Sequence, residues 1–174
     1  MRSRFLLLGL LPVALAACGG GSTASPAKST TTTKASSTQA FTIRVTSVVK
    51  TTRSHRQSPK VTTPGDRVEF VDDLLNTVPR FGKGVNEKIG SDKGTMTFTS
   101  TNTATMKGVA TLPDGTIVFQ GAVTVLPNNR LTVPVTGGTG KYEHASGTLL
   151  VGAGVKRATN TYTLLVAGAQ GPIA

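Results

Sequence analysis

The chain has 174 residues, of which 19 are Lys or Arg and 8 are Asp or Glu, so its formal net charge is +11. A single cysteine excludes an intrachain disulfide and a cysteine-rich metal site. There is no Trp and there are only 2 Tyr for base stacking, and the basic residues are spread along the chain. We therefore expect no nucleic-acid partner.

Residues 1–17 have the pattern of a secretory signal peptide, with a basic start, an apolar segment too short to span a bilayer, and small residues at the end. Leu15-Ala-Ala-Cys18 resembles the bacterial lipobox, in which the cysteine is lipidated and becomes the first residue of the mature protein. The alternative is a signal peptide with a cysteine near its cleavage site by chance. We predict a lipid on Cys18 that holds the protein on a bacterial envelope membrane, facing away from the cytoplasm.

Residues 18–40 contain almost no bulky apolar side chain and are rich in Thr, Ser and Gly. Such a segment cannot bury enough surface to offset the entropy of ordering, so we predict a flexible tether. Residues 41–174 then form one domain, which is long enough to have its own core.

Apolar and polar residues alternate with a period of two throughout this domain, which is typical of strands with one buried face. Ile117, Phe119 and Val123 share one predicted face, and Tyr162, Leu164 and Val166 share another. Turn signals separate the apolar segments, and short strands at this even spacing fit either a sandwich or a closed barrel. The predicted strands are 41–50, 67–72, 85–91, 94–101, 104–112, 116–125, 130–136 and 146–152, with 159–167 as a ninth or closing segment.

The segment Gly137-Gly-Thr-Gly-Lys141 looks at first like a phosphate-binding loop. A P-loop, however, needs a glycine five residues before the Gly-Lys pair and a Ser or Thr after it, and Val135 and Tyr142 occupy these positions. We predict instead that Gly137, Gly138, Gly140 and Gly147 serve a structural chain reversal, because glycine adopts positive φ at no steric cost.

Four segments occur in an order that resembles the allene oxide cyclase-like and dirigent-like β-barrel family. The resemblance covers roughly residues 41–168 and implies an all-β, eight-stranded antiparallel barrel of the calycin type with an apolar lumen. It also implies assembly as a homodimer or homotrimer. The segments are Gly65-Asp-Arg-Val-Glu-Phe70, Lys88-Ile-Gly-Ser-Asp-Lys-Gly94, Pro113-Asp-Gly-Thr-Ile117, and Val135-Thr-Gly-Gly-Thr-Gly-Lys-Tyr142 with Ala145-Ser-Gly147.

Asp72 and Asp73 are the candidate catalytic residues. Dirigent-like proteins carry an Asp-Asp pair after the corresponding strand, and Asp72 would share the face of Phe70 if that strand continues. A carboxylate at the apolar mouth of a barrel would have a raised pKa and could act as a general acid or base. The alternative is a strand-ending turn with solvated acids. We expect the aromatic residues of the pocket or barrel end to be Phe70, Phe119, Tyr142 and Tyr162.

The full catalytic sets of the resembled families are not present. Glu143 and Ser146 stand near where dirigent proteins carry arginines, and the first predicted strand lacks the glutamate of the plant cyclases. His55 and His144 have no metal-site spacing, so no metal or cofactor is predicted. We expect the barrel to bind a small hydrophobic ligand in its lumen. The alternatives are cyclase or isomerase activity by steric guidance of a reactive substrate, and a structural surface protein with a packed lumen.

Overall fold

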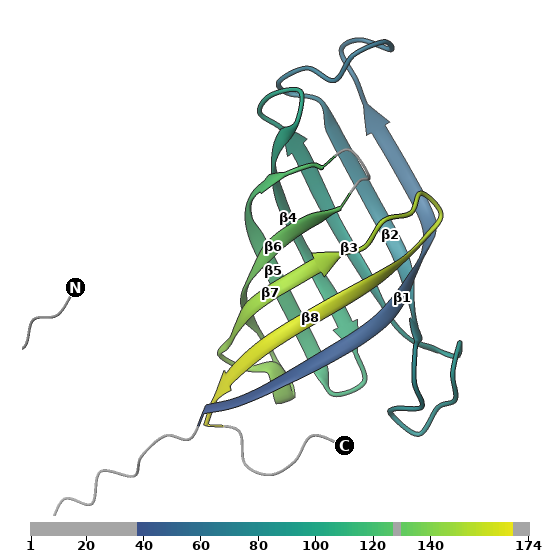
Figure 1. The fold of residues 1–174 in the computed structure, drawn as a ribbon, viewed down its shortest axis with the longest axis vertical. Coiled ribbons are helices and arrows are strands. Elements are labelled where there is room, and N and C mark those ends of the chain that lie inside the picture. Colours follow the sequence, from purple (N-terminus) through teal and green to yellow (C-terminus); the bar gives the residue numbers. More distant parts are fainter. Residues whose placement is uncertain (1–37, 127–129, 169–174) are drawn as a thin grey trace, which may run out of the picture. The chain divides into compact units, whose positions relative to one another are not determined.

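The computed structural model describes residues 38–126 and 130–168 and contains eight antiparallel strands around one core. Each strand pairs with the next along the chain, and the last pairs with the first, which closes the barrel (Figure 1). The predicted eight-stranded antiparallel barrel is therefore confirmed. The elements are β1 (Thr38–His55), β2 (Arg67–Asn76), β3 (Lys88–Phe98), β4 (Thr103–Leu112), β5 (Gly115–Thr124), β6 (Leu131–Gly138), the short 3-10 helix η1 (Gly140–Tyr142), β7 (Ala145–Val151) and β8 (Arg157–Ala167).

The core lies inside this barrel, where the inward residues of the alternating pattern are buried. On β5 the side chains of Ile117 and Phe119 are fully buried, and on β8 those of Tyr162 and Leu164 are fully buried. Their neighbours along each strand face outward, as the two-residue period requires. Burial of each such side chain contributes about 1.5–3 kcal/mol, which makes the shared interior the main source of stability.

One strand, β3 (Lys88–Phe98), replaces the two strands that were predicted over residues 85–91 and 94–101. The predicted break at residues 92–93 is absent, and Gly94 lies opposite Phe70 on β2 and Gly108 on β4. A Cβ at Gly94 would lie 2.6 Å from the Phe70 ring, and one at Gly108 would lie 2.5 Å from the Phe119 ring. These glycines make room for lumen aromatics inside continuous strands. Because β3 is one strand and not two, the barrel has eight strands rather than nine.

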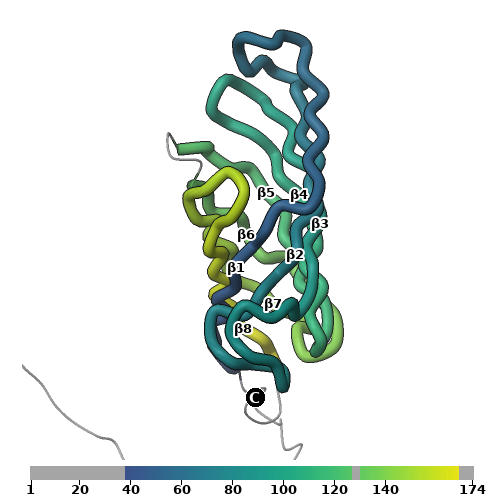
Figure 2. The backbone as a smooth tube through the Cα atoms, turned by 90° about the vertical axis from the view of Figure 1, so that its right-hand side faces the viewer, coloured from purple at the N-terminus to yellow at the C-terminus, as the bar shows by residue number. Residues whose placement is uncertain are grey.

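Strands β1 and β2 are both longer than predicted. β1 begins at Thr38 and continues through Arg53 to His55, past both ends of the predicted strand 41–50. The pairing of β1 with β8 ends at Val48 and Arg157, whereas β1 stays paired with β2 as far as His55. The β1–β2 ribbon therefore extends past the β7–β8 loop (Figure 2). β2 itself continues to Asn76, past the predicted end at residue 72, so the alternative of a strand-ending turn at the two aspartates is wrong.

The glycine-rich segment closes one end of the barrel. Gly140 has φ +62° and Gly147 has φ +136°, so both need the freedom of glycine. Gly137 and Gly138, in contrast, are the last residues of β6 and not part of the turn itself. The turn places Tyr142 inside, fully buried, with its ring centroid 6.1 Å from that of Phe41.

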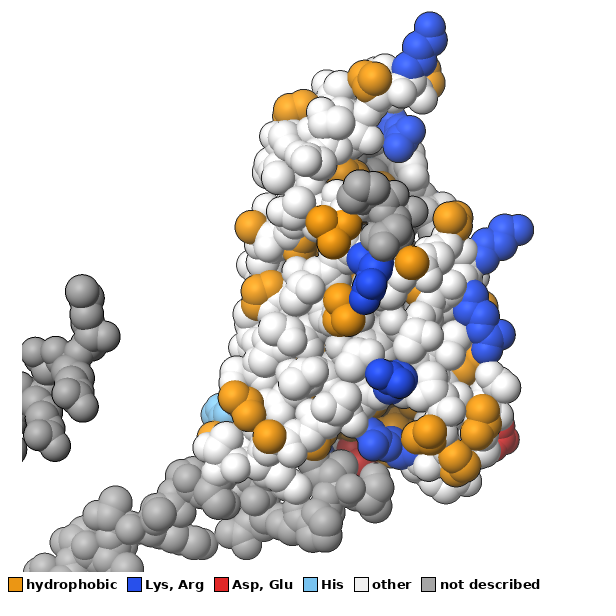
Figure 3. All heavy atoms as spheres, viewed as in Figure 1, with side chains coloured by type: hydrophobic (Ala, Val, Ile, Leu, Met, Phe, Trp, Pro, Cys, Tyr) orange, Lys and Arg blue, Asp and Glu red, His pale blue; other side chains and the backbone are white. Residues whose placement is uncertain are grey.

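The outer surface carries scattered basic side chains. On the face in Figure 3 the lysines and arginines are distributed over the whole length of the barrel and do not form one continuous patch. Within residues 38–126 and 130–168, no helix has the length and apolar character needed to cross a membrane.

Candidate functional site

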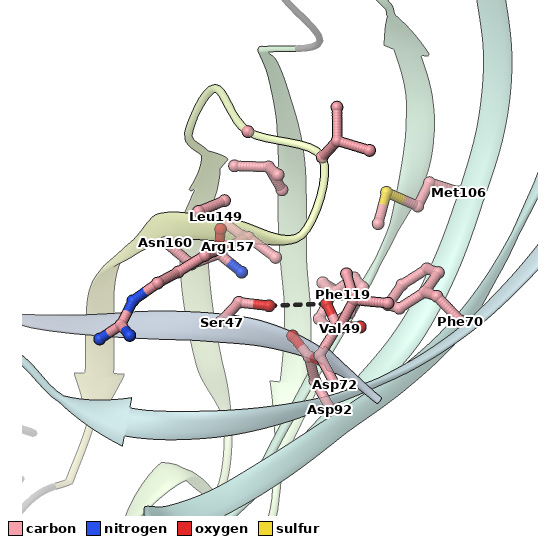
Figure 4. Close-up of a pocket in the computed structure, with 14 residues that line it drawn as sticks. Ser47, Val49, Phe70, Asp72, Asp92, Met106, Phe119, Leu149, Arg157 and Asn160 are labelled. Carbon is pink, nitrogen blue, oxygen red and sulfur yellow. Dashed lines mark hydrogen bonds between the residues drawn. The ribbon is translucent and has the colours of Figure 1, made fainter. Parts of the chain in front are cut away.

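A cavity of about 140 Å³ lies inside the barrel, away from the end that Tyr142 fills. Every strand except β6 contributes to its wall, and the β7–β8 loop adds Gly154 and the exposed Val155. Most of the wall is apolar, with a polar group on one side (Figure 4). The apolar side chains come from Val49, Phe70, Met106, Phe119, Leu149, Val151, Val155 and Ala158, and the polar ones from Ser47, Asp72, Asp92, Arg157 and Asn160.

Two carboxyl groups face each other across neighbouring strands in this wall. Asp72 on β2 lies directly opposite Asp92 on β3 in the antiparallel register. Side chains at such positions start from Cβ atoms about 4.5–5.5 Å apart, so their charges interact strongly. Ser47 on β1 donates a hydrogen bond of 2.6 Å from its Oγ to Oδ2 of Asp72 (Figure 4). The serine thereby holds one carboxyl of the pair in place.

Burial holds a proton on this pair near neutral pH. Asp92 is 2% exposed, and burial, reinforced by the nearby charge of Asp72, raises its pKa to about 7. Burial also raises the pKa of Asp72, although the Ser47 hydrogen bond opposes the rise. A carboxyl group with a pKa near 7 can both give and take a proton at neutral pH, as general acid–base chemistry requires.

The polar side of the cavity contains buried acceptor atoms that receive no hydrogen bond from the described residues. The Oδ1 atoms of Asp72, Asp92 and Asn160 are buried and have no hydrogen-bond partner among the described residues. The hydroxyl of the fully buried Tyr162 is likewise unpartnered there, and its pKa is raised by burial and by the charges of Asp92 and Asp72. The guanidinium of Arg157 at the cavity wall donates to Oδ1 of Asn86 at 2.9 Å.

Asp73 is not brought into this cavity. It lies one residue along β2 from Asp72, so its side chain points to the outer face. There its Oδ1 lies 2.7 Å from Nζ of Lys88, and this lysine lowers the pKa of the Asp73 carboxyl. The two aspartates that the sequence placed together therefore have separate surroundings.

The aromatic candidates divide between the cavity and the core. Phe70 and Phe119 line the cavity, whereas Tyr162 is buried in the core. The charges of Asp92 and Asp72 help to raise the pKa of Tyr162, so its hydroxyl lies near the carboxyl pair. Tyr142 packs at the closed end, where burial raises its pKa to about 12. Cys18 lies outside the described residues.

Sequence reasoning missed Asp92, Ser47 and Asn160. Asp92 lies in a Gly-Ser-Asp-Lys-Gly stretch that was read as a break between strands, so its position opposite Asp72 was hidden. Nothing in the local sequence distinguishes Ser47 or Asn160 from the many polar residues of β1 and β8.

Three small residues of the barrel, Gly121, Ala122 and Gly152, lie outside the cavity wall. Ala122 is exposed, a Cβ at Gly121 would meet the Pro134 ring at 2.7 Å, and Gly152 lies against the backbone of β8. These positions therefore do not create the cavity.

No protein-family model and no curated protein sequence matches the chain. Solved structures do match. A pyocyanin demethylase is 23% identical, with a TM-score of 0.60 over 71% of this chain and 99% of its own. The exo-specific intermolecular Diels-Alderase AbnU is 14% identical, with a TM-score of 0.60 over 75% of this chain and 99% of its own. The pterocarpan synthase dirigent protein GePTS1 is 14% identical, with a TM-score of 0.56 over 79% of this chain and 89% of its own. The described part of the chain therefore has the eight-stranded barrel fold of the dirigent and cyclase-like barrels.

Proposed function

We propose that this protein is a lipoprotein of a bacterial envelope whose barrel binds a small hydrophobic ligand in its lumen. The observation that carries the proposal is the cavity of about 140 Å³, with a wall that is mostly apolar and a polar side of buried, unpartnered acceptors. Ligand sites typically combine an apolar lining with a few convergent polar groups in this way. A structural barrel would need no such cavity, because tightly packed interiors are more stable.

The cavity volume limits the ligand. An apolar cavity of about 150 Å³ holds one benzene molecule, so about one ring or a short branched chain fits inside. Any further part of the ligand would lie toward the β7–β8 loop, where Val155 is 81% exposed. We infer a ligand with a small apolar group that is enclosed in the barrel.

The lipobox-like sequence that ends at Cys18 supports the anchor, and a tether between Cys18 and the start of β1 at Thr38 would hold the barrel away from the membrane surface. Metabolic labelling with a palmitate analogue tests this part of the proposal. The full chain should take up the label, and a Cys18→Ser variant should not. Equal labelling of the two would remove the lipid from Cys18.

Native mass spectrometry of the full chain, purified from the bacterium that encodes it, tests ligand binding and at the same time shows whether the protein is a monomer, homodimer or homotrimer. We expect an additional mass that is lost in Ala158→Phe, because Ala158 lines the cavity and a phenyl ring there would fill it. Thr159→Phe on the outer face of the same strand is the matched control and should keep the mass. An added mass that survives in Ala158→Phe would show that the ligand binds elsewhere.

The second candidate function is catalysis of the cyclase or isomerase type, favoured by the facing carboxyls of Asp72 and Asp92. If one carboxyl donates a proton to the substrate while the other accepts one, the substrate is isomerised with no net change in its atoms. Once the ligand is known, turnover should be abolished in Asp72→Ala and in Asp92→Asn while the circular dichroism of the barrel is unchanged. Full turnover in either variant would remove that residue from the mechanism.

A further inference from the structure

We propose that the cavity is selective for small amphiphilic cations: a primary or secondary ammonium group attached to an apolar body of about one ring. The inference rests on the proposed ligand-binding function and names the chemical class of the ligand. The ammonium group would lie between Asp72, Asp92 and Asn160, and the apolar body would pack against Phe70 and Phe119.

The buried acceptor atoms in the cavity wall indicate that the ligand carries hydrogen-bond donors. Asp92 and Asn160 are 2% and 4% exposed, and each presents a buried oxygen without a partner in the described part of the chain. Asp72 adds a third such oxygen, since Ser47 reaches only Oδ2. A buried acceptor without a donor costs about 1–3 kcal/mol. A primary ammonium group has three N–H donors and would remove this cost at all three oxygens, and a secondary ammonium group would remove it at two.

The charges around the cavity favour a cationic donor over a neutral one. Two carboxyls from β2 and β3 face each other, while the positive charge of Arg157 on β8 is directed to Asn86. Two other titratable groups act on or near the pair: Tyr162 on β8, which is neutral because burial raises its pKa, and Asp73 on the outer face of β2, whose charge helps to raise the pKa of Asp72. Charge-assisted hydrogen bonds are about twice as strong as neutral ones.

The apolar wall and the volume define the rest of the ligand. Phe70 and Phe119 lie beside the carboxyl pair in the wall, and Met106 and Leu149 complete an apolar surface around a space of about 140 Å³ (Figure 4). Aromatic faces also attract cations within about 6 Å. Benzylamine combines one ring with one ammonium group, and benzyl alcohol is its neutral counterpart of nearly the same shape.

Binding of the cation should also release a proton. The ammonium group favours the charged form of Asp92, so a proton held by Asp92 below about pH 7 leaves when the cation enters. The heat of binding at slightly acidic pH should then depend on the ionisation enthalpy of the buffer. Benzyl alcohol brings no charge and should release no proton.

Isothermal titration calorimetry of the full chain in detergent, with a detergent-only titration subtracted, tests the inference. At pH 8 we expect benzylamine to bind at least about tenfold more tightly than benzyl alcohol. Asp92→Asn should lose about tenfold affinity for benzylamine and keep its affinity for benzyl alcohol. Asp73→Asn, which removes a carboxyl from the outer face of the same sheet, should bind both compounds as the unmodified protein does.

Equal affinity for the two compounds, or an equal loss for both in Asp92→Asn, would overturn the cation selectivity while supporting ligand binding in the lumen. Failure of both compounds to bind would overturn the inference as well. Native mass spectrometry then decides the proposed ligand-binding function separately, because it detects a retained molecule of any class. Unchanged circular dichroism in Asp92→Asn distinguishes lost recognition from lost folding.

Discussion

The titration of Asp92 should make this barrel less stable as the pH rises from acid to neutral. Its pKa in the folded protein is about 7, above the ordinary value of 3.8, because burial penalises the charged form. Between these two values the folded state binds more protons than the unfolded state, so the free energy of unfolding falls with rising pH. The contribution is complete below about pH 4 and is lost as the pH rises through 7.

The magnitude follows from the two pKa values. A rise from 3.8 to about 7 corresponds to about 4 kcal/mol, at about 1.4 kcal/mol for each unit of pH, and about 3 kcal/mol of this falls between about pH 4.5 and 7.5. Asp66 and Asp73 do not mask the effect. Hydrogen bonds from Gln57 and Thr63 lower the pKa of Asp66, and Lys88 lowers that of Asp73, so both titrate below this range.

Urea unfolding at about pH 4.5 and pH 7.5 measures the effect, with far-UV circular dichroism as the signal because the chain has no Trp. The protein should lose about 3 kcal/mol between the two pH values. Asp92→Asn, which is neutral at both, should lose much less, because only the raised pKa of Asp72 then remains to make stability fall with pH. The control Asp73→Asn should keep the full pH dependence, because its carboxyl is paired with Lys88 on the outside.

Removal of Asp72 gives a second, independent test of the same pair. The charge of Asp72 raises the pKa of Asp92, so Asp72→Asn should move the loss of stability to lower pH. The same pH dependence in Asp92→Asn as in the unmodified protein would refute the reasoning, since the proton would then be held by another group.

Three further predictions concern the glycines and one buried amide. Gly147→Ala should lower the free energy of unfolding by more than about 2 kcal/mol, because Gly147 has φ +136° and a Cβ would overlap the backbone oxygen of Thr163. Gly137→Ala should instead raise the free energy of unfolding by about 0.5 kcal/mol, because a Cβ there meets nothing within 4 Å. The urea midpoints of the two variants measure both changes. Similar changes at the two sites would contradict the distinction between them. Asn76→Ala should cost about 2 kcal/mol and make the β2–β3 loop sensitive to protease, because its buried Nδ2 donates to three loop carbonyls at 2.8–3.2 Å. An intact loop and an unchanged midpoint would show that the amide is dispensable.

The amino-acid sequence determined which face of most strands is buried. The period of two placed Ile117, Phe119, Tyr162 and Leu164 inside, and the structure buries all of them. This inference succeeds because side chains alternate across a strand whatever its neighbours are. The same rule placed Asp72 on the face of Phe70, and the structure has both in the cavity wall.

Only the tertiary structure decided the partners across strands. Whether Gly94 makes a turn or accommodates a ring depends on the presence of Phe70 opposite, and this register is a property of the closed barrel. The same register brings Asp92 to Asp72 and leaves Asp73 outside with Lys88. The local sequence specifies to which face of a strand each side chain points. The burial of a side chain, its pKa and the chemistry of a site depend on residues that the fold brings together from distant positions in the chain.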